Sequence, residues 1–92
     1  MKPLNEYSFS QFRSNIASAV KDHESWYYSQ SATAYYADYK PKYPEKTAAD
    51  FTIMLDFGHT NARLNIYADT ALVPIINQFS NMQDLITELH NM

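Results

Sequence analysis

Residues 50–69 read DFTIMLDFGHTNARLNIYAD, and this stretch indicates the fold most clearly. Apolar residues occupy alternate positions on both sides of the GHTN segment, which is the period of a half-buried β-strand. We therefore predict two strands, over 50–57 and 62–68, that form an antiparallel hairpin with its turn centred on His59 and Thr60.

The two predicted strands fit together in one register. Four opposing pairs define it: Asp56–Arg63, Leu55–Leu64, Ile53–Ile66 and Phe57–Ala62. The apolar pairs share one face, and the opposite-charge pair on the other face adds about a few tenths of a kcal/mol. A shift by one residue would turn every apolar side chain toward solvent. The hydrophobic pattern and the charge pattern therefore predict the same pairing.

A helix is predicted before the hairpin. Ser8 and Gln11 have the spacing of a capping box. Apolar residues then recur at steps of three and four residues, as on one face of a helix. We predict a helix from about residue 8 to somewhere between residues 24 and 29, because residues 26–28 could continue the apolar face.

A second helix is predicted at the C-terminus. Ser80 and Gln83 repeat the capping-box spacing ahead of a short apolar stripe over 82–89. Pro74 suits the first turn of a preceding helical segment over 74–79, although this segment could instead be irregular.

The segment over 33–40 fits two secondary structures. Its alternating tyrosines suit a strand, whereas its alanine and tyrosine spacing also suits a helix. The proline-containing segment that follows is predicted as a loop. The expected fold is α+β: an N-terminal helix, an antiparallel sheet of two or three strands with the 50–57/62–68 hairpin, and a C-terminal helix.

Composition restricts the class of protein. The 92 residues suit a single compact domain over 1–92. The chain has no cysteine and one glycine, which excludes thiolate metal sites and Gly-rich nucleotide-binding loops. We expect no cofactor and no metal. The N-terminus lacks the apolar core of a signal peptide and no apolar run is long enough to cross a membrane, so a cytoplasmic location is expected.

The charge argues against free nucleic acid as the main partner. The net charge is −3 and the pI is about 5.4, whereas nucleic-acid binding needs a basic surface. Lys40, Lys42 and Lys46 form a local basic cluster. It is either a solvated loop or a contact for phosphate or an acidic patch, and the sequence supports both interpretations equally.

No catalytic constellation is present in the sequence. Asp56, Phe57 and Gly58 spell a kinase metal-binding tripeptide, but the chain is too short for a kinase, and a strand end with a turn glycine explains them. The three histidines lack the spacing of a metal site. We therefore predict that the protein is not an enzyme, with a small enzyme using His59 as the weaker alternative.

The best functional lead is the aromatic stretch over 26–43, WYYSQSATAYYADYKPKY, which contains six of the eight tyrosines and the only tryptophan. Tyrosine and tryptophan beside small polar residues are typical of binding surfaces. The same rings could belong to the core or form a platform for stacking sugars or bases. We favour a macromolecular interface and expect Tyr36 and Tyr43 to be its most exposed members. The residues predicted to bind a partner are Tyr28, Tyr35, Tyr36, Tyr39, Lys40, Lys42 and Tyr43.

The overall profile is similar to that of anti-CRISPR proteins, which are small anti-defence inhibitors carried by phages and plasmids. The shared features are one compact acidic domain, no cysteine, no catalytic motif and a polar–aromatic segment. This resemblance implies a non-catalytic inhibitor that binds a host protein or ribonucleoprotein complex in the host cytoplasm and blocks nucleic-acid access or nuclease recruitment. An adaptor or regulatory subunit of a cellular complex is the alternative. The resemblance is carried by no specific residue.

Overall fold

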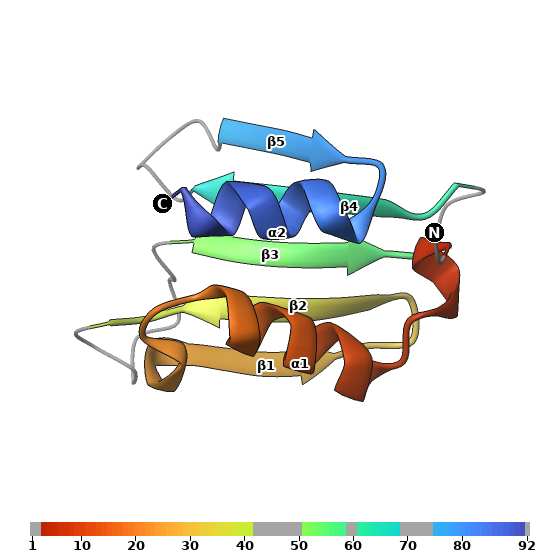
Figure 1. Cartoon of the computed structure of the whole chain (residues 1–92). Helices are drawn as coiled ribbons and strands as arrows, with labels where there is room; N and C mark the ends of the chain where they lie inside the picture. Colours follow the sequence, from red (N-terminus) through yellow and green to blue (C-terminus); the bar gives the residue numbers. More distant parts are fainter. Residues whose placement is uncertain (1–2, 42–50, 59–60, 69–74, 92) are drawn as a thin grey trace.

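A computed structural model describes residues 3–41, 51–58, 61–68 and 75–91, and the side chains of all these except 68 and 75–77. These residues form one antiparallel sheet with two α-helices on one of its faces (Figure 1). The elements in chain order are η1 (Leu4–Glu6), α1 (Phe9–Ala19), η2 (His23–Ser25), β1 (Trp26–Gln30), β2 (Ala34–Tyr39), β3 (Phe51–Asp56), β4 (Arg63–Ala68), β5 (Ile75–Phe79) and α2 (Met82–His90). The predicted α+β class is confirmed.

The sheet has five strands, so the prediction of two or three strands was too low. Each strand pairs with the next one along the chain, in the spatial order β1-β2-β3-β4-β5. All four pairings are antiparallel. Figure 1 shows α1 in front of β1 and β2 and α2 in front of β3 and β4. In the part of the chain that the structure describes, the opposite face of the sheet carries no helix.

The central hairpin is confirmed in its predicted register. Leu55 lies opposite Leu64, Ile53 opposite Ile66, and Asp56 opposite Arg63. The four apolar residues of these pairs are buried beneath the helices. The ambiguous segment over 33–40 is strand β2, because both of its edges are paired, with β1 on one side and β3 on the other.

The first helix begins as predicted but ends earlier. The backbone N–H of Gln11 donates to Ser8 Oγ at 3.1 Å, and the N–H of Ser8 donates to Gln11 Oε1 at 2.9 Å, which completes the capping box. However, α1 ends at Ala19, so the prediction that it reaches residues 24–29 was wrong. Trp26 begins β1 instead. The aromatic run suits a pleated surface and gains a hydrogen-bonded ladder with β2, which outweighs its helical spacing.

Two details of the C-terminal region also differ from prediction. The residues after Pro74 form strand β5 and not a helical segment, because adjacent β-branched isoleucines pair along β4; Pro74 itself lies outside the described residues. The N-cap of α2 is Asn81 and not Ser80. The backbone N–H of Asp84 donates to Asn81 Oδ1 at 2.8 Å. Asparagine caps a helix at least as well as serine.

The core lies between the two helices and the sheet. Its largest fully buried side chains are Phe12, Ile16, Ile53, Leu55, Leu64 and Leu85. Burying a side chain of this size stabilises the fold by about 1.5–3 kcal/mol. Both helices supply an apolar stripe, and the sheet supplies alternate residues of its central strands. Among the described residues, no helix is long and apolar enough to cross a membrane.

Candidate functional site

The strand period divides the tyrosine-rich segment between the two faces of the sheet. Tyr28, Tyr35 and Tyr39 lie on the face that α1 and α2 cover, and all three pack against the core. Tyr27 and Tyr36 occupy the alternate positions and therefore lie on the opposite face. The residues predicted to form one interface thus belong to two different surfaces.

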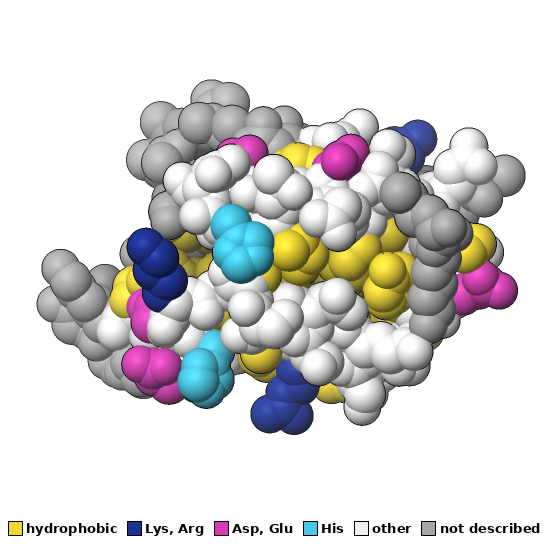
Figure 2. Space-filling view, viewed as in Figure 1, with side chains coloured by type: hydrophobic (Ala, Val, Ile, Leu, Met, Phe, Trp, Pro, Cys, Tyr) yellow, Lys and Arg dark blue, Asp and Glu magenta, His cyan; other side chains and the backbone are white. Residues whose placement is uncertain are grey.

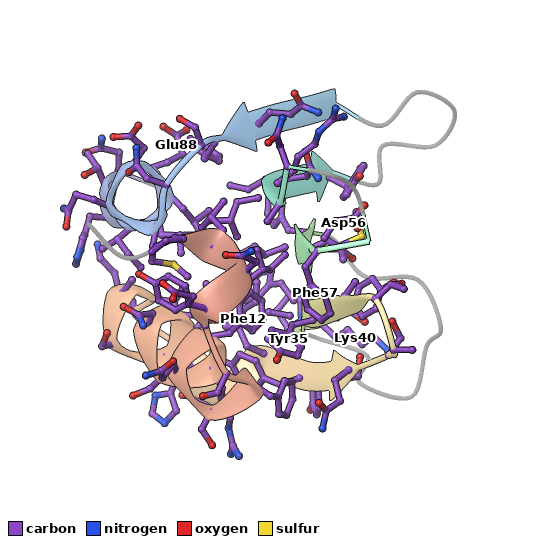
Figure 3. The ribbon with its side chains drawn as sticks, turned by 90° about the vertical axis from the view of Figure 1, so that its right-hand side faces the viewer. Phe12, Tyr35, Lys40, Asp56, Phe57 and Glu88 are labelled. Carbon is purple, nitrogen blue, oxygen red and sulfur yellow. The ribbon has the colours of Figure 1, made fainter. Side chains whose placement is uncertain are left out.

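Tyr35 is part of an aromatic cluster beneath α1 (Figure 3). Its ring centroid lies 5.8 Å from that of Phe12 and 4.8 Å from that of Phe57, with a third contact to Phe9 at 5.5 Å. The contacts with Phe9 and Phe57 are edge-to-face, a geometry worth about 0.5–1.5 kcal/mol beyond the burial itself. Tyr35 therefore stabilises the fold.

Tyr39 and Tyr28 also make their side-chain contacts on the helix-covered face. The Tyr39 hydroxyl donates to Asp22 Oδ2 at 2.8 Å, and its ring lies 5.0 Å from the ring of Trp26. The Arg13 guanidinium lies 5.5 Å from the centre of the Tyr28 ring. Burial raises the pKa of the Tyr28 hydroxyl, and the positive charge of Arg13 opposes part of this rise.

The two lysines and the last tyrosine of the predicted interface are placed differently. Lys40 follows β2, is partly buried, and donates its backbone N–H to the carbonyl of Ser25 at 2.9 Å. Lys42 and Tyr43 lie outside the described residues, so their predicted role stays a prediction.

We call the side of the sheet opposite α1 and α2 the helix-free face. Two cross-strand rows of described side chains define it: Tyr27–Asp38–Thr52–Tyr67 and Ser29–Tyr36–Met54–Asn65–Gln78. The pair Asp56–Arg63 lies beyond the second row. This face therefore carries three tyrosines and a methionine among small polar groups, which is the composition of protein-binding surfaces.

Tyr27, and not Tyr36 as predicted, is the most exposed aromatic residue of this face, because Tyr36 is half-buried. Its relative exposure is 43%, and no other large hydrophobic side chain in the described residues is classed as exposed. It lies on β1, at one edge of the sheet. An exposed ring at this position provides rigid contact area that the fold itself does not use.

Asn65 lies on β4, in the second row of the helix-free face, and is only 3% exposed. Its neighbours on the adjoining strands are Met54 and Gln78. Within the described part of the chain, its buried Oδ1 accepts no hydrogen bond. An unsatisfied buried polar atom costs about 1–3 kcal/mol, so this oxygen atom lowers the stability of the free fold.

The charges of the helix-free face are mainly acidic. Asp38 accepts a hydrogen bond from Thr52 Oγ1 at 2.9 Å, and Asp56 lies opposite Arg63. The pKa of Tyr67 is raised, mainly by burial and secondarily by the negative charge of Asp56. Two carboxylates against one guanidinium give this face little attraction for a phosphate backbone.

The helix-bearing side has a different surface. Figure 2 shows polar side chains over both helices and hydrophobic side chains in the seam between them. A hollow of about 320 Å³ beside this seam is lined in part by Tyr7, Met82 and Ile86. Tyr7 and Met82 pack with the core, so the apolar side chains of the seam belong to the packing between the two helices.

A larger cavity lies where the C-terminal ends of α1 and α2 meet the sheet. Its volume is about 480 Å³, and its lining includes the cross-strand row Trp26–Tyr39–Phe51 with Val20 and Leu89. This size suits a small ligand. The lining is mainly apolar, so the cavity offers shape and aromatic surface more than reactive groups.

The described residues contain no group of three or more metal-binding side chains. His23 lies 3.8 Å from Glu24, and both side chains are largely exposed. Asp56 Oδ1 accepts the backbone N–H of Gly58 at 2.9 Å, which explains the kinase-like tripeptide as a local turn. His59, the residue of the enzymatic alternative, lies outside the described residues.

No family model, no curated protein and no solved structure matches this chain.

Sequence reasoning did not include Tyr27, Met54, Asn65 and Tyr67 among the candidate binding residues. The signal was present, because residues two positions apart in a strand share a face. Choosing the uncovered face required knowing that both helices pack on the same side of the sheet, which no local pattern contains.

Proposed function

We propose that this chain is a non-catalytic binding protein that attaches to a protein, or to the protein surface of a ribonucleoprotein complex, through its helix-free face. The observation that supports this is that one uncovered face carries Tyr27, Tyr36 and Tyr67 in the same two cross-strand rows as the buried Asn65, whose Oδ1 accepts no hydrogen bond from the described residues. The rings supply contact area at low entropic cost. A hydrogen-bond donor of the partner that reached this Oδ1 atom would satisfy it.

The charge of this face favours protein over nucleic acid. A stacking platform for single-stranded nucleic acid combines aromatic rings with basic groups that follow the phosphates. Here the rings stand beside Asp38 and Asp56, with Arg63 as the one described basic side chain of the face. The same tyrosines beside carboxylates suit a polar protein surface with basic groups.

We further propose that binding inhibits the partner, and that the partner is a host complex that processes nucleic acid. The support is the similarity to anti-CRISPR proteins in size, acidity and composition. An acidic domain attached beside a basic nucleic-acid channel would block access sterically and electrostatically.

Site-specific photocrosslinking tests the proposed face. p-Benzoylphenylalanine introduced at Tyr36 or at Tyr67 should crosslink to a host protein that mass spectrometry then identifies. The matched control is the same probe at Ser14, an exposed position on α1. Crosslinks from Ser14 with none from Tyr36 or Tyr67 would place the interface elsewhere.

The inhibitory role needs a separate assay. The purified chain should lower the nuclease or nucleic-acid-binding activity of the captured complex in proportion to its occupancy. Binding with unchanged activity would identify an adaptor instead.

A further inference from the structure

β1 is one outer strand of the sheet, and no other described strand pairs with its outer edge. Within the described residues, β1 pairs with β2 on one side only. Natural edge strands usually carry lysine, proline or a bulge that prevents pairing with another chain. The sequence of β1, WYYSQ, contains no charged residue and no proline.

The hydrogen bonds at the two ends of β1 show which backbone groups face β2. The carbonyl of Ser25 accepts from the N–H of Lys40 at 2.9 Å, and the N–H of Ser31 donates to the carbonyl of Ala34 at 2.8 Å. Backbone groups in an antiparallel pair alternate in direction along each strand. The odd-numbered residues of β1 therefore bond to β2, and the even-numbered residues direct their groups to the free edge.

Five backbone groups are directed to this edge. The N–H and C=O of Tyr28 and of Gln30 face outward, as does the C=O of Trp26, whose N–H instead donates to the carbonyl of His23. Two strands exchange groups of this kind when they pair. The free edge is therefore a template for an incoming strand that extends over the five residues of β1.

Side chains on the two faces of β1 specify what such a strand carries. On the helix-covered face, the exposed Arg13 lies over Tyr28 at 5.5 Å, and no carboxylate among the described residues pairs with it. On the helix-free face, the ring of Tyr27 is exposed. An incoming strand would be complementary to β1 if it placed a carboxylate on the helix-covered face, near Arg13, and an apolar side chain on the helix-free face, near Tyr27.

We propose that β1 pairs with an extended segment of a protein partner, in which acidic side chains toward Arg13 alternate with apolar side chains toward Tyr27. This proposal rests on the proposed function, since the new strand would extend the helix-free face at Tyr27. A second copy of this chain fits less well. Two β1 strands paired antiparallel about Tyr28 would bring two Arg13 side chains together.

A peptide probe tests the pairing directly. The acetylated and amidated peptide Thr-Val-Glu-Val-Glu-Val-Thr has the required alternation. Amide hydrogen exchange, measured by NMR on the full chain, should slow at least about tenfold at Tyr28 and Gln30 when the peptide saturates the edge, because these N–H groups become bonded. The amides of Tyr27 and Ser29 already bond to β2 and should change little.

The charge and the edge have matched controls. The peptide with lysine in place of glutamate should bind more weakly. Arg13→Ser should weaken binding of the glutamate peptide by about two- to fivefold, as expected for an exposed ion pair, whereas Arg13→Lys should retain most of it. Gln30→Pro removes one outward N–H at an edge position where proline is tolerated, and it should abolish the protection at Tyr28. Tyr27→Lys places a lysine on the edge strand, as natural edge strands do to prevent pairing. It replaces Gln30→Pro in this test if the proline variant does not fold.

Three results would overturn the proposal. The peptide could leave exchange at Tyr28 and Gln30 unchanged. It could bind equally well with lysine in place of glutamate. The two amides could already be protected in the free protein in a concentration-dependent manner, which would identify a second copy as the occupant.

Failure of this proposal is distinguishable from failure of the proposed function. If Gln30→Pro or Tyr27→Lys retains the partner crosslink from Tyr67, the helix-free face binds without the edge, and the pairing proposal is wrong. If the glutamate peptide protects Tyr28 and Gln30 but neither Tyr36 nor Tyr67 crosslinks to a partner, the edge pairs while the proposed face does not bind.

Discussion

Replacing Asn65 with leucine should stabilise the free protein. Leucine has the same branching and the same number of side-chain heavy atoms, so it can occupy the buried site of Asn65 on β4. The substitution removes the unsatisfied Oδ1 atom, whose burial costs about 1–3 kcal/mol, and leucine is less disfavoured than asparagine in a strand. We expect a net gain of about 1–2 kcal/mol in the free energy of unfolding.

Chemical and thermal unfolding measure this gain. For a chain of this size, about 1 kcal/mol corresponds to a rise in Tm of roughly 4–8 °C. The urea midpoint should rise while the slope of the transition stays constant. The same variant should crosslink less to the partner from Tyr67, because it removes the amide that we assign to the interface.

Asn65→Asp is the matched opposite change. Burial without a partner would raise the pKa of the new carboxyl above its value in the unfolded chain, about 3.9. The variant should therefore approach the parent in stability below about pH 4 and lose stability progressively as the pH rises. Destabilisation by Asn65→Leu of more than about 1 kcal/mol would show that the asparagine is satisfied in solution and would refute the reasoning.

Three further predictions concern other parts of the fold. Tyr35→Ala should lower the free energy of unfolding by about 3–5 kcal/mol, because it removes the central ring of the aromatic cluster beneath α1. Tyr36→Ala, on the other face, should lower it by less than about 1 kcal/mol. Equal losses in urea titrations would contradict the assignment of the two tyrosines to opposite faces. Asn81→Ala should cost about 1 kcal/mol in a thermal melt through loss of the α2 cap, and Ser80→Ala, the control, should leave Tm unchanged. Because the pKa of Tyr28 is raised in the folded state, its contribution to stability should be lost as the pH rises above about 10; Tyr28→Phe should reduce this alkaline loss, and an unchanged pH profile would contradict it.

The central hairpin was predictable because its information is local. The alternation around Ile53 and Ile66 has the period of a strand, and the pair Asp56–Arg63 selects the same register. The cap at Ser8 was predictable for the same reason, since its partner is three residues away.

The outer strands were not predictable from local patterns. The aromatic run at 26–28 has both helical and strand spacing, and its pairing with β2 decides the outcome. The residues after Pro74 likewise become a strand because the edge of β4 is available to them. In both segments, contacts with a neighbouring strand outweigh intrinsic preference.

The candidate site depended on the same long-range information. The composition of residues 26–43 indicated a surface rich in tyrosine, but not which rings remain outside the core. Tyr36 and Tyr35 are adjacent in the sequence and lie on opposite faces. The choice between them follows from the placement of α1, which contacts Tyr35 through Phe12.

The order of the strands has a consequence for how the chain folds. Every strand pairs with its neighbour in the sequence, so the sheet can grow through hairpins without bringing distant segments together. The helices come from opposite ends of the chain and yet contact each other, and this contact closes the longest loop. We therefore expect substitutions at Ile53 or Leu64 to slow refolding, whereas Leu85→Ala in α2 should mainly accelerate unfolding. The sheet would then be largely formed in the transition state, and the joining of the two helices would follow it.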